Sequence, residues 1–230
     1  TPMAKVKAVT FDLWDTIVDD DSDEAARAER GLLSKRDERR RLLFEAIDAD
    51  GKIDRGAVEL AFDVADAAFN HVWRNGHVTW TVRQRVGVIL QGLQRTLPEA
   101  ALERVIGDLE RMEVDIPPNL IPGCDAALAE ISKQYVCAIV SDAIVTPGRE
   151  LRRLLDKHGA KKYFAGFAFS DEVGRSKPHR AMFESAAQQL GVAVNEMVHV
   201  GDREHNDVLG AHALGMRAVL FTATRGVDRE

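Results

Sequence analysis

The chain has 230 residues, of which 45% are hydrophobic and 30% are charged, the composition of an ordinary globular protein. Its formal net charge of −6 argues against a nucleic-acid-binding protein that depends on a basic surface. The longest apolar runs are about as long as a strand, so we expect no transmembrane helix, no membrane partner and no signal peptide. Cys124 and Cys137 show neither a metal-type spacing nor a disulfide framework, which indicates a reducing, cytoplasmic environment.

Five short apolar segments, rich in β-branched residues, predict buried parallel strands. Helical patterns separate the later segments, and a glycine follows each of these helices where a helix commonly ends. Strands that alternate with helices form a parallel α/β sheet with right-handed crossovers, which is the fold class that we predict. The predicted strands are Lys7–Phe11, Val136–Val140, Gly166–Phe169, Met197–Val200 and Ala218–Phe221. The predicted helices of this part are Gly148–His158, Ala181–Leu190 and Asn206–Leu214.

The segment of residues 19–118 interrupts this alternation, because it contains helical patterns and no convincing strand. We therefore predict an all-helical domain, residues 19–118, inserted into an α/β core domain formed by residues 1–18 and 119–230. Ser22 is expected to cap the first inserted helix through its side-chain oxygen. The predicted helices of the insert are Asp23–Asp48, Arg55–Arg74, Thr79–Thr96 and Pro98–Glu113.

Polar residues stand where the predicted strands end. Open parallel sheets bind ligands beyond the carboxyl ends of their strands, so we expect these side chains to share one rim of the sheet. A single aspartate there is explained equally well as a turn or helix cap. Caps do not readily explain why several carboxylates, a hydroxyl and an ammonium group all follow strands of the same predicted sheet. The residues are Asp12, Ser141, Asp142, Lys177, Asp202 and Asp207.

Such a rim has a predictable chemistry. Several carboxylates in one small region repel each other, and a divalent cation removes that penalty. Hard oxygen ligands favour Mg²⁺. Lys177 can offset the negative charge or hold an anionic substrate. A carboxylate beside a bound cation can act as a nucleophile, and the hydroxyl groups of Thr16 and Ser141 can donate to oxygens of the group that is transferred.

Four motifs in order, "FDLWDT", "AIVSD", "GRSKP" and "GDREHND", resemble those of the haloacid dehalogenase (HAD) superfamily of hydrolases. The resemblance extends from about Lys5 to Thr222, and the helical insert stands where that superfamily has its type 1 cap. It implies a Rossmann-like parallel sheet core with an inserted all-helical cap domain.

The resemblance also implies catalytic roles. Asp12 is the implied nucleophile, Lys177 steadies the nucleophile and the leaving charge, and Thr16 belongs to the catalytic set. Ser141, with Asp142 beside it, binds substrate oxygens together with Lys177.

The implied cofactor is Mg²⁺. Its ligands are Asp12, Asp202, the nearby Asp207 and the backbone carbonyl of Trp14.

Trp14 marks a departure from this family. Phosphatases of the superfamily carry a second aspartate there, which protonates the leaving group and later activates water. Asp15 stands one position later, and because successive side chains of an extended segment point apart, we expect it to brace the loop or the cap instead. Dehalogenases need no such acid and often have an aromatic residue at this position, whereas Asp202 in "GDREHND" is typical of the Mg²⁺-dependent members.

The favoured function is therefore a Mg²⁺-dependent phosphatase that acts on a small phosphorylated metabolite. One alternative is a metal-independent hydrolase of a small halogenated acid, a 2-haloacid dehalogenase. Another is a non-catalytic HAD-fold binding protein, although the retention of Asp12, Lys177 and Asp202 argues against it.

Two groups of residues in the insert are expected to be structural. A predicted turn is surrounded by Trp73, Trp80, His71 and His77. One interpretation is that they line the substrate entrance, but we favour packing of the insert's interior or of its docking face. A basic patch is formed by Arg36, Arg39, Arg40 and Arg41. The resemblance allows an anion-attracting face, since dehalogenases use a cap arginine to receive halide and carboxylate, but we favour a solvated helix face.

Overall fold

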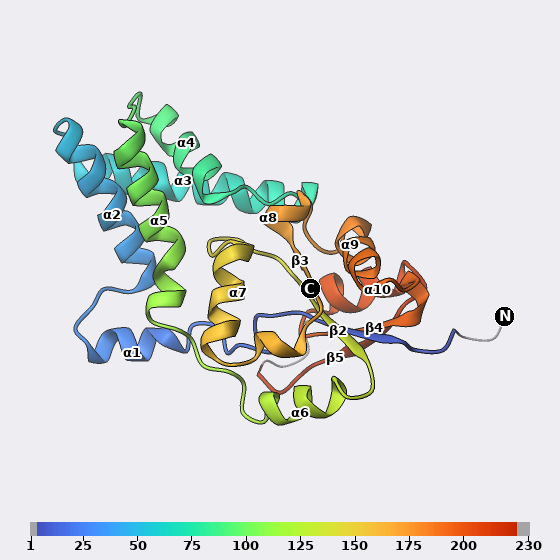
Figure 1. Cartoon of the computed structure of the whole chain (residues 1–230). Helices are drawn as coiled ribbons and strands as arrows, with labels where there is room; N and C mark the ends of the chain where they lie inside the picture. The colour runs from blue at the N-terminus through green and yellow to red at the C-terminus, as the bar shows by residue number, and fades with distance from the viewer. Residues whose placement is uncertain (1–3, 225–230) are drawn as a thin grey trace.

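The computed structural model describes residues 4–224. Its centre is a sheet of five parallel strands in the order β3-β2-β1-β4-β5 (Figure 1). All five predicted strands are present, with ends that shift by a single residue at most, and the predicted α/β fold is confirmed. The strands are β1 (Ala8–Phe11), β2 (Val136–Ser141), β3 (Gly166–Phe169), β4 (Met197–Gly201) and β5 (Arg217–Leu220).

Helices cover both faces of the sheet because side chains alternate along each strand. In β1, Phe11 packs into a core cluster with Leu151 of α7, whereas Ala8 packs into a second cluster with Phe183 of α9. The flanking helices are α6 (Cys124–Ile131), α7 (Gly148–Lys157), α8 (Ser170–Val173), α9 (Arg180–Leu190) and α10 (Gly210–His212). Shorter helical turns are η1 (Lys161–Tyr163), η2 (Val194–Glu196) and η3 (Glu204–Leu209), the last a π-helix. The sequence pattern did not predict α6.

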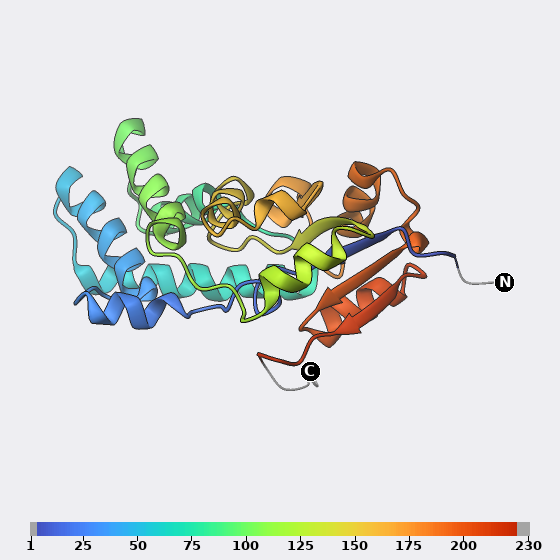
Figure 2. The same cartoon turned by 60° about the horizontal axis from the view of Figure 1, so that its bottom comes forward.

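The chain between β1 and α6 is all helical, as predicted. Its helices lie beside the sheet, and α3 reaches from this bundle to the sheet (Figures 1 and 2). A separate core cluster that includes Leu43, Ile47 and Phe62 holds the bundle together. No described helix combines the length and apolarity needed to cross a membrane. The helices are α1 (Asp23–Glu29), α2 (Lys35–Asp50), α3 (Arg55–Gly76), α4 (Val82–Gly92) and α5 (Glu99–Asp115).

The first predicted helix of this segment is wrong in one respect, because residues 23–48 form two helices. The chain turns at Gly31, whose φ of +67° suits glycine, and Ser34 then caps α2 by accepting a hydrogen bond from the Asp37 N–H at 3.1 Å. Ser22 does not cap α1. Its hydroxyl instead accepts a hydrogen bond from the Asn119 N–H at 2.8 Å, which ties together the two chain segments that join the helices to the sheet.

The helical segment also contacts the loop that follows β2. Lys35 is buried, and its Nζ lies 2.9 Å from carboxylate oxygens of both Asp23 and Glu113. Glu113 in turn accepts a hydrogen bond from the hydroxyl of Thr146. Because an unpaired buried charge is strongly destabilising, these contacts fix the helices against this loop.

Candidate active site

The strand register brings the polar residues to one level. Phe11 of β1 pairs with Ile139 of β2 and with Val200 of β4. One or two positions further along each strand, the chain therefore brings three polar residues out together at the carboxyl edge of the sheet: Asp12, Ser141 and Asp202. A cavity of about 100 Å³ opens there, and its lining includes Asp12, Trp14, Ser141, Asp142, Lys177 and Asp202.

Lys177 links two of the predicted site residues. Its Nζ donates hydrogen bonds to Oδ1 of Asp12 at 2.7 Å and to Oδ1 of Asp207 at 2.6 Å. Burial lowers the pKa of Lys177, but the charges of Asp12 and Asp207 outweigh this effect and hold the pKa above its usual range. The lysine therefore stays an ammonium group in contact with Asp12.

Asp207 is held by more than Lys177. His199 lies with Nε2 3.1 Å from Oδ1 of Asp207, and its Nδ1 lies 2.8 Å from the hydroxyl of Thr10. Burial raises the pKa of Asp207, but Lys177 and His199 outweigh it and hold the pKa below its usual range. Asp207 therefore stays ionised. Gly201 makes room for it, since a Cβ on Gly201 would lie 2.2 Å from Cγ of Asp207.

Three buried carboxylates are close enough to share a metal ion. Asp12, Asp202 and Asp207 each offer an oxygen, and these oxygens lie within 4.8 Å of one another. A donor set made only of carboxylate oxygens suits a hard cation, and the residues present therefore fit Mg²⁺.

Asp142 connects the cavity to the helical segment. Its Oδ1 accepts a hydrogen bond from the backbone N–H of Lys177, and its Oδ2 accepts one from Nε1 of Trp73 in α3, both at 2.9 Å. Burial raises the pKa of Asp142 to about 6. Packing of the insert or its docking face was the favoured prediction for Trp73, ahead of a place at the substrate entrance. The sequence gives only a general indication of this hydrogen bond, which is that a buried indole N–H usually finds an acceptor.

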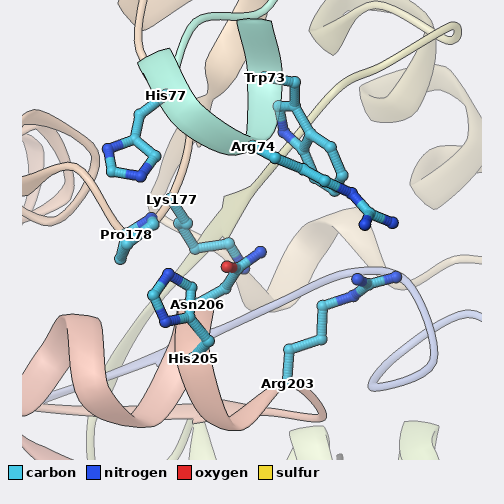
Figure 3. Close-up of a pocket in the computed structure, with 8 residues that line it drawn as sticks. All are labelled: Trp73, Arg74, His77, Lys177, Pro178, Arg203, His205 and Asn206. Carbon is cyan, nitrogen blue, oxygen red and sulfur yellow. The ribbon is translucent and has the colours of Figure 1, made fainter. Parts of the chain in front are cut away.

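A second, outer cavity of about 270 Å³ adjoins the first, and both are lined by Trp73, Lys177, Arg203 and Asn206. Figure 3 shows Trp73, Arg74 and His77, from the end of α3, facing Arg203, His205 and Asn206 across this space. The sequence pattern did not identify Arg74 or Arg203, because each is an ordinary surface arginine until the fold places the two segments opposite each other.

Trp14, Asp15 and Asp20 come from the loop after β1. Trp14 is half-buried and lines the inner cavity, so no ionisable side chain stands at that position. Asp15 has a φ of +56°, and its carboxylate accepts a hydrogen bond from the backbone N–H of Asp20 at 3.2 Å. This hydrogen bond joins two residues of the same loop, as expected for a side chain that braces the loop.

Asp20 also lines the inner cavity, and the sequence pattern did not single it out. Asp20 is exposed, but the protein around its carboxylate still removes part of the solvent. This desolvation raises the pKa of Asp20 to about 6, and the charge of Asp21 adds to the rise. The carboxyl group is therefore half protonated near pH 6.

Two predicted residues do not line this cavity: Asp207, which contacts it through Lys177, and Thr16, which lies elsewhere. Thr16 is buried, and it lines a different, largely apolar cavity next to Ile17 and Cys124. Its Oγ1 has no hydrogen-bond partner among residues 4–224.

Comparison with known proteins gives one family match and several relatives. The family model for haloacid dehalogenase-like hydrolases matches residues 6–215. A glyceraldehyde 3-phosphate phosphatase of Pyrococcus furiosus is 30% identical over 102 residues, 44% of this chain and 41% of that protein. The chain thus spans less than half of this relative's length. The 5-amino-6-(5-phospho-D-ribitylamino)uracil phosphatase YigB of Escherichia coli is 26% identical over 98% of this chain and 87% of its own length.

Solved structures of phosphatases and dehalogenases share the fold. A HAD phosphatase from Thermococcus onnurineus has a TM-score of 0.59 and 22% identity, covering 96% of this chain and 89% of that one. A 2-haloacid dehalogenase from Pseudomonas syringae pv. Tomato has a TM-score of 0.57 and 21% identity, covering 94% and 86%. Since the family model spans most of the sequence, the chain belongs to the haloacid dehalogenase-like hydrolases.

Proposed function

We propose that the protein is a Mg²⁺-dependent phosphatase of a small phosphorylated metabolite, with Asp12 as its nucleophile. The observation that carries this proposal is the contact of Lys177 with both Asp12 and Asp207, next to the third carboxylate of Asp202. Relatives such as the glyceraldehyde 3-phosphate phosphatase act on substrates of this chemical class.

The chemistry follows from the position of Asp12. Lys177 holds one carboxylate oxygen, which orients the other toward the cavity. That oxygen attacks phosphorus, the bond from phosphorus to the leaving oxygen breaks, and an aspartyl phosphate forms. Water then attacks the same phosphorus, which releases phosphate and restores the Asp12 carboxylate. Mg²⁺ held by Asp12, Asp202 and Asp207 supplies positive charge for the oxygens of the phosphoryl group.

The leaving oxygen of most metabolites needs a proton, and Trp14 does not supply one. Among the carboxylates that line the cavity, Asp142 is engaged through both oxygens. Asp15 and Asp20 each accept a backbone hydrogen bond, from the N–H groups of Asp20 and Asp21 respectively, and desolvation raises the pKa of Asp20. We assign the role of acid to Asp20, which lines the same cavity. Its pKa of about 6 keeps a fraction of these carboxyl groups protonated near neutral pH, more than an aspartate of ordinary pKa would retain.

We expect Asp20→Asn to lower kcat for an alkyl phosphate by about 10²-fold, the lower end of what general acid catalysis contributes. Hydrolysis of p-nitrophenyl phosphate should change little, because nitrophenolate leaves without a proton. Because the protonated form is lost as pH rises through about 6, the wild-type kcat for the alkyl phosphate should fall there, and the variant should lack this dependence. Asp19→Asn, in the same loop, is the matched control. Equal losses with both substrates would remove the assignment.

We also propose that residues 19–118 act as a cap domain over a core of residues 1–18 and 119–230. Trp73 reaches from α3 to Asp142, so the helical segment forms part of the site itself. The outer cavity carries Arg74 and Arg203, which favours substrates whose body bears further oxygen acceptors or a second negative charge.

Trp14 keeps a second candidate function open, the metal-independent dehalogenase. One experiment separates the two: p-nitrophenyl phosphate with Mg²⁺ or EDTA, and 2-chloropropionate in EDTA. We expect Mg²⁺-dependent release of nitrophenolate and no release of chloride. Chloride release in EDTA without phosphatase turnover would establish the dehalogenase, and tight binding of phosphate compounds without any turnover would indicate a binding protein.

A further inference from the structure

A fourth cavity lies in the helical segment, apart from the proposed active site. Its volume is about 260 Å³, and none of its lining residues lines the inner or the outer cavity. Apolar side chains from α3, α4 and α5 line it together with arginines of α2 and α4. The arginines are Arg36, Arg39, Arg40 and Arg85.

These four arginines differ in their exposure to solvent. Arg36 is exposed and Arg39 is half-buried, whereas Arg40 and Arg85 are only 6% and 9% exposed. The Nε groups of Arg39, Arg40 and Arg85 are buried, and within the described part of the chain none has a hydrogen-bond partner. The expectation of a solvated helix face is therefore wrong for Arg40, which stacks over the ring of Phe62 at 4.7 Å.

The carboxylates nearby do not balance these charges. Asp66 lies 3.7 Å from Arg40 and 3.4 Å from Arg85, and Asp63 contacts Arg36 and Arg40. Asp37 lies 3.7 Å from Arg36, so four guanidinium groups face three carboxylates. Burial lowers the pKa of Arg85, which shows that its charge is poorly solvated there. An anion in the cavity would supply both the missing charge and acceptors for the buried N–H groups.

We propose that this cavity binds a small organic anion. Its carboxylate or phosphate head would lie on the guanidinium groups of Arg39, Arg40 and Arg85. Its apolar body would contact Val82 and Ile89, which also line this cavity. The volume suits one small molecule, and the mixture of an apolar lining with a few convergent polar groups is typical of ligand sites.

The position of the cavity connects it to the proposed active site. Val145 lines it, and Arg85 donates a hydrogen bond from Nη2 to the carbonyl oxygen of Ile144 at 2.9 Å. Ile144 lines the inner cavity together with Asp12. A bound anion therefore contacts both the helical segment and the loop that carries Asp142, and it fixes one against the other.

Methyl NMR tests the proposal, with isoleucine δ1 methyl groups labelled in the whole chain. Ile89 reports on this cavity and is buried in its wall. The probe is phenylphosphonate, which combines an anionic head with an apolar ring and is not hydrolysed, titrated in EDTA. We expect a saturable shift of the Ile89 signal, and weaker binding of inorganic phosphate, which lacks the apolar body.

Arg39→Met should weaken the Ile89 response about tenfold, since hydrogen bonds to charged groups are among the strongest. Arg104→Met, which removes the same charge from an exposed position on α5, should leave it unchanged. If Arg39→Met does not fold, Arg39→Gln, which removes the charge but keeps a polar side chain, gives the same comparison. An Ile89 signal that does not move, or equal affinities in the cavity variant and the control, would overturn the proposal.

Discussion

Asp12→Asn should abolish Mg²⁺-dependent hydrolysis of p-nitrophenyl phosphate, with a fall in kcat of at least about 10⁴-fold, as expected when a nucleophile is removed. The amide has nearly the same shape as the carboxylate, but it cannot form the aspartyl phosphate. It also loses the charge that faces Lys177 at 2.7 Å. The measurement is steady-state turnover of purified variants at saturating Mg²⁺.

The matched control is Asp156→Asn, which makes the same chemical change at an exposed position on α7. It should retain full turnover. Substantial phosphatase activity in Asp12→Asn would show that a different group attacks, and the assignment of this cavity as the active site would fail.

Lys177→Met should have the largest effect on stability. Removing the ammonium group leaves the carboxylates of Asp12 and Asp207 buried side by side without their cation. Breaking a buried ion pair in this way lowers the free energy of unfolding by about 3–5 kcal/mol. Urea denaturation in EDTA measures the loss, and turnover should fall with it, because Lys177 contacts the nucleophile.

Two further variants make this prediction specific. Lys161→Met removes an exposed lysine and should change the free energy of unfolding by less than about 0.5 kcal/mol. The double variant Lys177→Met with Asp207→Asn should recover part of the loss, because it removes one of the two stranded charges. A loss below about 1 kcal/mol in Lys177→Met would contradict a buried, tightly coupled pair.

The sequence predicts the sheet and its polar rim well, for a physical reason. Buried parallel strands appear as apolar runs, and the polar residue that ends each run must emerge at the same edge of the sheet. The strand pattern alone therefore predicts that Asp12 and Asp202, which are 190 residues apart, lie close together. The contact of Lys177 with Asp12 was implied by the family resemblance, because Lys177 lies in a loop beyond α8 rather than at the end of a strand.

Contacts between the helical segment and the sheet were not predictable in this way. The hydrogen bond from Trp73 to Asp142 joins residues from two different parts of the fold, and no local pattern encodes how a helix docks. Burial of Arg40 was missed for the same reason, because it depends on Phe62 of a neighbouring helix. The break in the first helix had a local signal in Gly31, which the continuous helical pattern around it outweighed.

The most direct test of the central claim is a crystal structure of the protein with Mg²⁺ and beryllofluoride, which mimics a phosphoryl group on a carboxylate. We expect beryllofluoride bound to a carboxylate oxygen of Asp12, with Lys177 in contact and Mg²⁺ held by Asp12 and Asp202. Beryllofluoride at another residue, or Mg²⁺ bound away from these two carboxylates, would contradict the proposed mechanism.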